Sequence, residues 1–100
     1  MNYLDDLADK IRAAVEPRDL PHDDTRDLFR MYALLLLAKG AAVNEADVHN
    51  AWVSWMAGRD SSHEALLPYD QLGDDVAEQD EPYVEAIRTV ARAVQGGEAL

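Results

Sequence analysis

Residues 31–38, MYALLLLA, form the longest uninterrupted apolar run in the sequence and decide its fold. A helix that is apolar all round must be covered on every side, so this run predicts a central, buried helix. The preceding residues 23–25, Asp-Asp-Thr, offer N-caps, and Lys39-Gly40 offers a cationic last turn followed by a C′ glycine. The run is too short to cross a bilayer, which takes about 20 apolar residues.

Two further helices flank this one in the sequence. Residues 2–15 carry apolar side chains at spacings of three and four, which predicts one helical face, and Pro17 ends the pattern. Asn44 is a good N-cap for the next helix, and Asp47 forms part of a capping box with it. Gly58 follows the last apolar position and ends that helix.

The rest of the chain lacks a helical period until close to its end. We predict a structured loop over residues 60–74 with a short extended piece at residues 65–67. A last helix then begins between residues 75 and 82. The fold class is therefore all-α, with four main helices and a structured loop between helices 3 and 4, in a single domain over residues 1–100. Its parts are an N-terminal helical pair (1–43), a helix-loop-helix unit (44–95) and a frayed tail (96–100).

The composition excludes several classes of function. The 100 residues include no cysteine, so neither disulfides nor thiolate metal sites can form. Lys and Arg total 9 against 20 Asp and Glu, a formal net charge of −11, and this disfavours binding to nucleic acid. No basic region precedes an apolar one at the N-terminus, so we expect no signal peptide, no membrane insertion and a cytoplasmic location.

Common catalytic and metal-binding patterns are missing from the sequence. It has no Gly-rich phosphate loop and no His-Glu-x-x-His helix. His63 follows two serines directly and is poorly placed to act as their general base. The acidic residues between positions 70 and 80 do not have the spacing of a calcium loop. We therefore expect a protein that is not an enzyme and holds no cofactor and no metal.

Acidic residues gather in one part of the chain. Residues 60–85 hold nine Asp or Glu and no Lys or Arg. Such a segment attracts basic surfaces within about one Debye length, roughly 10 Å at 0.1 M salt. We expect it to dock a cellular protein with a basic surface, and the candidate partner-binding acids are Asp70, Asp74, Asp75 and Glu78. Two alternatives are that the charge serves only solubility, or that the protein mimics a nucleic acid.

The two tryptophans lie three residues apart, at neighbouring positions of one helical face. We expect Trp52 in the core. Trp55 with Met56 could instead edge a partner-binding groove, because Trp and Met are favoured at interfaces. The same edge could also be buried in a homodimer.

The segment from Val48 onward resembles the ryanodine-receptor-type (RyR) domain. The matching stretches are VHNAW at 48–52, SHEALLPYDQL at 62–72, and Asp80 with the helix after it. That family has a His-x-x-Trp helix, a loop of the type His-Pro-x-Leu-x-Pro-Tyr-x-x-Leu, and an Asp before a closing helix. The resemblance covers about half of the chain. The whole chain is also similar to small actinobacterial and actinophage proteins, which fits its 16 Ala and its 7 Arg against 2 Lys.

The RyR resemblance implies a non-enzymatic module. Such modules are protein-contacting repeats in large channels, and related bacterial and phage modules have been proposed as sensors of nucleotide-derived ligands. Carried over to this sequence, the ligand site would comprise His49, Trp52, His63, Pro68, Tyr69 and Asp80. Structural roles are the alternative: Asp80 could be a helix N-cap, and His63 could tie the loop to a backbone carbonyl.

We therefore expect a small acidic interaction protein, bacterial or phage-encoded, that binds a host protein through its acidic loop and helix face. If it is phage-encoded, it would modulate or inhibit that protein. A RyR-type sensor of a nucleotide-derived ligand is the alternative.

Overall fold

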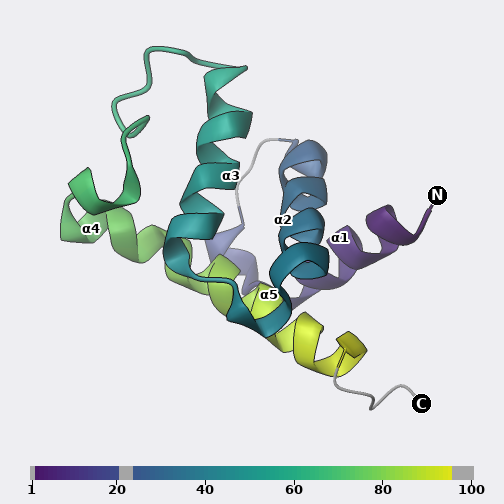
Figure 1. Ribbon diagram of the computed structural model, residues 1–100. Coiled ribbons are helices and arrows are strands. Elements are labelled where there is room, and N and C mark those ends of the chain that lie inside the picture. Colours follow the sequence, from purple (N-terminus) through teal and green to yellow (C-terminus); the bar gives the residue numbers. More distant parts are fainter. Residues whose placement is uncertain (1, 21–23, 96–100) are drawn as a thin grey trace.

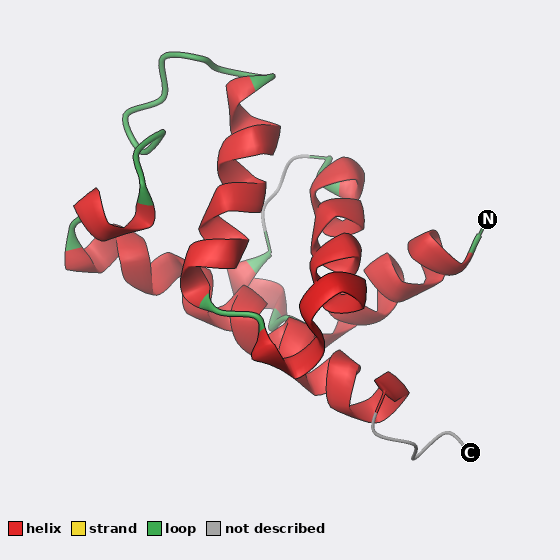
Figure 2. Cartoon of the chain, viewed as in Figure 1, coloured by secondary structure: helices red, strands yellow, loops and turns green. Residues whose placement is uncertain are grey.

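The computed structural model describes residues 2–20 and 24–95, and within these ranges the regular structure is helical throughout (Figure 1, Figure 2). This confirms the predicted all-α class and its four main helices. The long helices are α1 (Tyr3–Ala14), α2 (Arg26–Lys39), α3 (Glu45–Ala57) and α5 (Glu81–Gln95). A single-turn helix, α4 (Asp74–Ala77), lies between α3 and α5. The predicted tail at residues 96–100 and the candidate N-cap at position 23 lie outside the described residues.

The first, second and last long helices build most of the core. α1 packs against α2 and α5, and α3 packs against α2 and α5 from the other side. In Figure 1, α5 runs beneath α2 and α3. Two aromatic side chains of α2, Phe29 and Tyr32, meet edge to face with 5.3 Å between ring centroids, and Tyr83 of α5 lies 5.7 Å from Tyr32. No described helix is long and apolar enough to span a membrane.

The prediction that α2 is covered on every side is wrong. Leu36 is 0% exposed and Tyr32 is buried, but Leu34 is 55% exposed and Leu37 is exposed as well. The neighbours of α2 are α1, α3 and α5, and they cover only part of its circumference. The described residues contain no further long helix to cover the remaining face, so two leucines of the apolar run face outward.

The acidic segment after α3 is less regular than the helices and contains no β-strand within residues 61–73. The prediction of an extended stretch at residues 65–67 is wrong: Ala65 lies in a turn, and a 3₁₀ turn, Tyr69–Gln71, follows. A short apolar run becomes a strand only where another strand can satisfy its backbone groups, and this fold offers none. In Figure 1 the segment leaves the top of α3, arcs outward and descends to α4.

Helix ends follow the local sequence closely. The side chain of Asn44 accepts a hydrogen bond from the Asp47 amide at 3.0 Å, and the Asp47 carboxylate accepts one from the Asn44 amide at 3.1 Å. This is a complete capping box for α3. At the end of α2, Gly40 adopts a positive φ of 57°, which explains why glycine follows Lys39.

Asn44→Ala is expected to lower the free energy of unfolding by about 1 kcal/mol, because it removes the side-chain acceptor of this box. Urea denaturation followed by circular dichroism measures the change. Asn50→Ala, at an exposed position within the same helix, is the matched control and should not destabilise the protein. Equal effects of the two substitutions would contradict the capping role.

Candidate functional site

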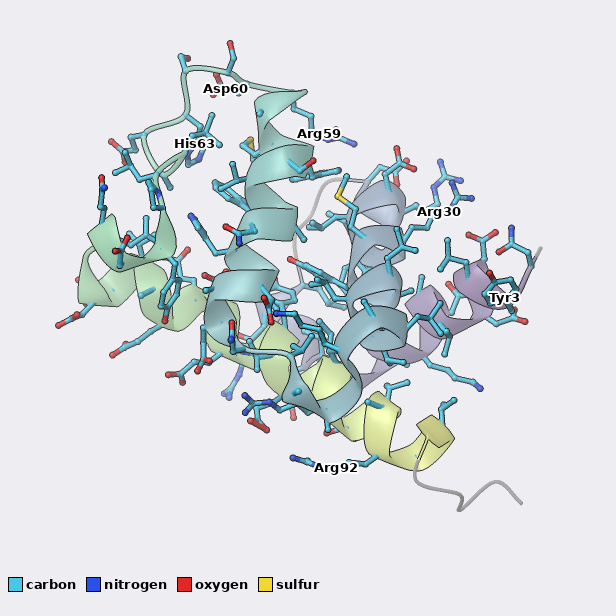
Figure 3. The ribbon with its side chains drawn as sticks, viewed as in Figure 1. Tyr3, Arg30, Arg59, Asp60, His63 and Arg92 are labelled. Carbon is cyan, nitrogen blue, oxygen red and sulfur yellow. The ribbon has the colours of Figure 1, made fainter. Side chains whose placement is uncertain are left out.

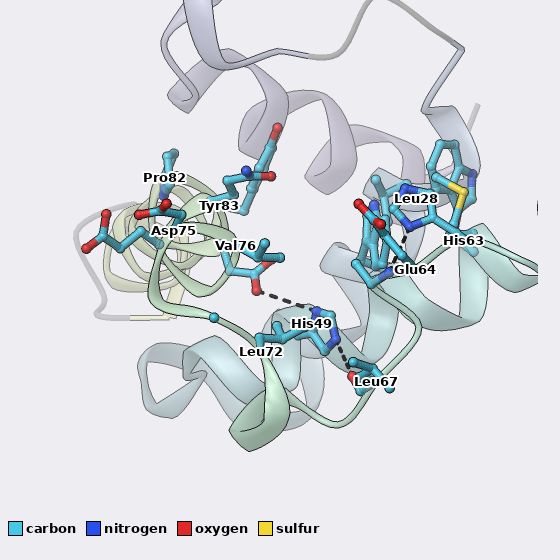
Figure 4. A pocket seen from close by; sticks show the side chains of 18 of the residues that line it. Leu28, His49, His63, Glu64, Leu67, Leu72, Asp75, Val76, Pro82 and Tyr83 are labelled. Carbon is cyan, nitrogen blue, oxygen red and sulfur yellow. Dashed lines mark hydrogen bonds and ion pairs between the residues drawn. The ribbon is translucent and has the colours of Figure 1, made fainter.

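An open groove of about 950 Å³ lies between α3 and the segment that leads into α5 (Figure 4). Its residues come from the connection before α2, from α2 and α3, and from residues 63–83. They are Arg18, Asp19, Leu28, Tyr32, His49, Trp52, Trp55, Met56, His63, Glu64, Ala65, Leu67, Gln71, Leu72, Gly73, Asp75, Val76, Glu78, Gln79, Asp80, Pro82 and Tyr83.

His49 links the two sides of the groove. It is 2% exposed, and its Nε2 lies 2.6 Å from the backbone carbonyl of Leu67 (Figure 4). A carbonyl oxygen only accepts, so Nε2 carries the proton of this hydrogen bond. The other nitrogen, Nδ1, faces the carboxylate of Asp80 at 3.6 Å from Oδ2. His49 therefore ties the loop to α3 through a backbone carbonyl. The structural alternative had given this role to His63.

Asp80 is a buried carboxyl group, 8% exposed, at the end of the segment that leads into α5. Its side chain accepts no hydrogen bond within the described residues, so it is not the side-chain N-cap of α5 that the structural alternative supposed. Burial raises the pKa of Asp80 to about 6; the nearby His49 opposes this shift and Glu45 adds to it. Perturbed carboxyl groups in clefts are typical of functional sites.

Aromatic rings extend from His49 along the groove and into the loop. Trp52 stacks on His49 with 5.6 Å between ring centroids and meets His63 edge to face at 5.1 Å. Tyr69 lies 6.1 Å from His49 on the outer side. His63, on the inner side of the loop in Figure 3, accepts a hydrogen bond at Nδ1 from the amide of Ala65. The loop is thus held against α3 mainly by ring contacts.

Five of the six residues that the RyR resemblance implies therefore lie together: His49, Trp52, His63, Tyr69 and Asp80. Pro68 is exposed directly before the 3₁₀ turn. Neither Pro68 nor Tyr69 lines the groove.

Residues 2–92 match the family described as "Domain of unknown function (DUF7701)". The chain belongs to this family. The matched span contains every residue that lines the groove, so the groove is built entirely within the DUF7701 domain. No curated protein and no solved structure matches the chain. The RyR resemblance stays a prediction.

The predicted partner-binding acids of this DUF7701 domain fall into two groups. Asp75 and Glu78 line the groove and are exposed, whereas Asp70 and Asp74 are exposed outside it. This division provides matched variants, because all four residues belong to the same acidic segment.

Both tryptophans contribute to the core, Trp55 as a buried member and Trp52 packed against it. Trp55 is the more buried of the two, at 8% exposed, and the guanidinium of Arg59 lies 4.3 Å above its ring centroid. Trp52 is half-buried. Trp55 and Met56 do line the groove, but Trp55 presents little surface to a partner. A spacing of three places both rings on one face and does not reveal that Arg59, one turn further on, covers the second ring.

Sequence reasoning missed the contribution of the first half of the chain to the groove. Leu28 and Tyr32 of α2 line it, as do Arg18 and Asp19 from the connection before α2. The Tyr83 hydroxyl donates to the Asp19 carbonyl at 2.6 Å and holds that connection beside α5. No local pattern signals this pairing across 64 positions.

Within the described residues, no group of three or more His, Asp or Glu is arranged to hold a metal ion. The acidic side chains are instead distributed over the groove lining and the outer surface.

Proposed function

We propose that this protein is a small, non-enzymatic, cytoplasmic interaction protein that binds a basic segment of another protein in its groove. The charge of the groove lining supports the proposal. The lining contains five carboxylates and one arginine, so a positively charged occupant is favoured. The carboxylates are those of Asp19, Glu64, Asp75, Glu78 and Asp80, and the arginine is Arg18.

The arrangement of these charges favours a segment of protein over a single ion. Asp75 and Glu78 are exposed near the rim, whereas Asp80 is buried. The exposed and the buried carboxylates can therefore each pair with a different basic side chain of the same protein segment. Exposed carboxylates add association rate and specificity more than affinity, so binding should be strongly salt-dependent.

Removing two charges inside the groove is expected to weaken capture of the partner, and removing two outside it is not. The test uses immobilised protein and an actinobacterial lysate, with bound proteins identified by mass spectrometry at low and moderate salt. The groove variant is Asp75→Asn with Glu78→Gln, and the matched control is Asp70→Asn with Asp74→Asn. We expect a basic protein that wild type and control retain at low salt, that moderate salt elutes, and that the groove variant loses.

Two results would contradict this proposal. One is capture that does not change with salt, because the attraction would then not be electrostatic. The other is equal retention by the groove variant and the control, because the groove would then not be the docking face.

A small-molecule binding module is the second candidate. It is favoured by the clustering of five residues that the RyR resemblance implies. The five carboxylates disfavour a ligand that carries several phosphates. A nucleoside-like ligand with little negative charge is expected to raise the free energy of unfolding by RT ln(1 + [L]/Kd), and the melting temperature with it. A flat response to a panel of nucleosides and nucleotides would rule out this candidate for those compounds.

A further inference from the structure

Asp80 lacks the hydrogen-bond partner that a buried carboxylate needs, although the imidazole of His49 lies within ion-pair distance of it. Within the described residues it accepts no hydrogen bond, and its Oδ2 is 3.6 Å from His49 Nδ1, too far for one. Burying a charged group is costly unless it is paired and hydrogen-bonded. The carboxyl group nevertheless lines the groove, where an occupant can approach the exposed part of its side chain.

The groove that contains this carboxyl group is also lined by apolar side chains. Leu72 and Val76 line the groove on the side of the acidic segment, and Trp52 and Met56 line it on the side of α3. Apolar side chains and a buried carboxyl group in one groove match a side chain that has an aliphatic stem and a cationic end. Lysine and arginine are the two residues with that form, since both bury their methylene stems on apolar surfaces.

We infer that the groove accepts an arginine or lysine side chain of the partner, with its stem against Leu72 and Val76 and its cationic end at the Asp80 carboxylate. This inference rests on the proposed function and names the anchor within it. Asp75 and Glu78 at the rim then pair with basic residues next to the anchoring side chain. Arginine and lysine both fit, because Oδ2 of Asp80 is enclosed and a single N–H donor is enough for a charge-assisted hydrogen bond to the other oxygen.

Binding of this kind is coupled to the ionisation of Asp80. A cation attracts the carboxylate and not the neutral acid, so affinity should fall as the pH drops below about 6, the pKa to which burial raises this group. The ionisable groups that act on Asp80, or on which it acts, come from each neighbouring element. They are Glu45 and His49 of α3, Tyr32 of α2, Tyr69 of the 3₁₀ turn and Tyr83 of α5.

The experiment uses N-acetyl-arginine amide as the probe and N-acetyl-citrulline amide as its uncharged isostere. Nitrogen-15 NMR spectra of the full chain report the indole of Trp52 and the backbone amides of residues 72–80. The variants are Asp80→Asn and, as a matched exposed control outside the groove, Asp70→Asn. Spectra at about pH 7 and about pH 5 bracket the titration of Asp80.

We expect the arginine derivative to shift these signals in wild type and in Asp70→Asn, with no effect of the citrulline derivative. Affinity for Asp80→Asn should be at least about tenfold lower, in line with the loss of one member of a partly buried charge pair. Wild type should bind more weakly at the lower pH. This pH series tests the same anchor without a substitution, should the variant not fold.

The anchor inference is overturned if Asp80→Asn binds the arginine derivative as wild type does, or if citrulline gives the same shifts. In that event the proposed function can still stand, because capture of a basic protein that depends on Asp75 and Glu78 does not require Asp80. Loss of capture in every arm, with an intact response to the arginine derivative, would overturn the docking function and leave a single-cation site.

Discussion

Leu36→Ala is expected to lower the free energy of unfolding by about 3–5 kcal/mol. Leu36 is fully buried in α2, where α1, α3 and α5 pack around that helix. Removing its side chain beyond Cβ leaves a cavity that rigid neighbouring helices cannot close. For a domain of this size the loss is a large part of the total stability. Urea denaturation followed by circular dichroism measures it.

Leu34→Ala is the matched control, because it makes the same chemical change two residues away in the same apolar run. Leu34 is more than half exposed, so its truncation should cost less than about 1 kcal/mol. A large loss at Leu34 would show that this face of α2 is buried in solution. That result would favour a homodimer through α2 over the predicted one through Trp55 and Met56.

Asp80→Asn is expected to remove a pH dependence of stability that wild type has. The pKa of Asp80 is raised from 3.8 to about 6 in the folded protein, so folding favours the neutral acid. Neutral Asp80 therefore contributes to the free energy of unfolding. This contribution is fully present below pH 3.8 and is lost as the pH rises through about 6. The whole effect is about 3 kcal/mol, and roughly half of it falls between about pH 5 and about pH 7.

The measurement is the free energy of unfolding of wild type and Asp80→Asn at about pH 5 and about pH 7, taken as a difference between the two proteins. The difference cancels the carboxyl groups that both proteins share. Among them are Asp5, whose pKa is lowered by the hydrogen bond from Arg30, and Asp47, whose pKa is raised by burial but lowered overall by hydrogen bonds from Lys39 and the Asn44 amide. The stabilisation that these two groups contribute is lost on acidification. Wild type should gain stability relative to the variant at the lower pH. An identical pH dependence of both proteins would mean that Asp80 is not buried as described.

Helix positions could be predicted because their signals are local. The capping box of Asn44 and Asp47, the positive φ of Gly40 and the break at Pro17 each depend on residues within one turn. Coverage of α2 could not be predicted in the same way. The apolar run shows that Leu34 tolerates burial, but whether a neighbouring helix reaches it depends on how the whole chain packs.

The candidate site could be predicted only in part, and not from local signals. Its α3 and loop residues came from the resemblance to a known family, not from their spacing in the sequence. The residues that complete the groove, Asp19 and Tyr32 among them, lie far away along the chain and carry no motif. The acidic segment favoured a positively charged partner as a prediction, whereas the burial of one carboxyl group within it appears only in three dimensions.

Residues 61–72 form no backbone hydrogen bonds with the long helices among the described residues, and one side-chain hydrogen bond, from His49 to the Leu67 carbonyl, connects them to α3. We therefore expect the outer wall of the groove and the helical core to belong to different cooperative units. Separating this wall from α3 requires breaking the hydrogen bond and the ring contacts of His63 and Tyr69 with α3. We expect the free-energy cost to be well below that of global unfolding. Such local opening would let the groove widen for a larger side chain while the core of α1, α2 and α5 stays folded.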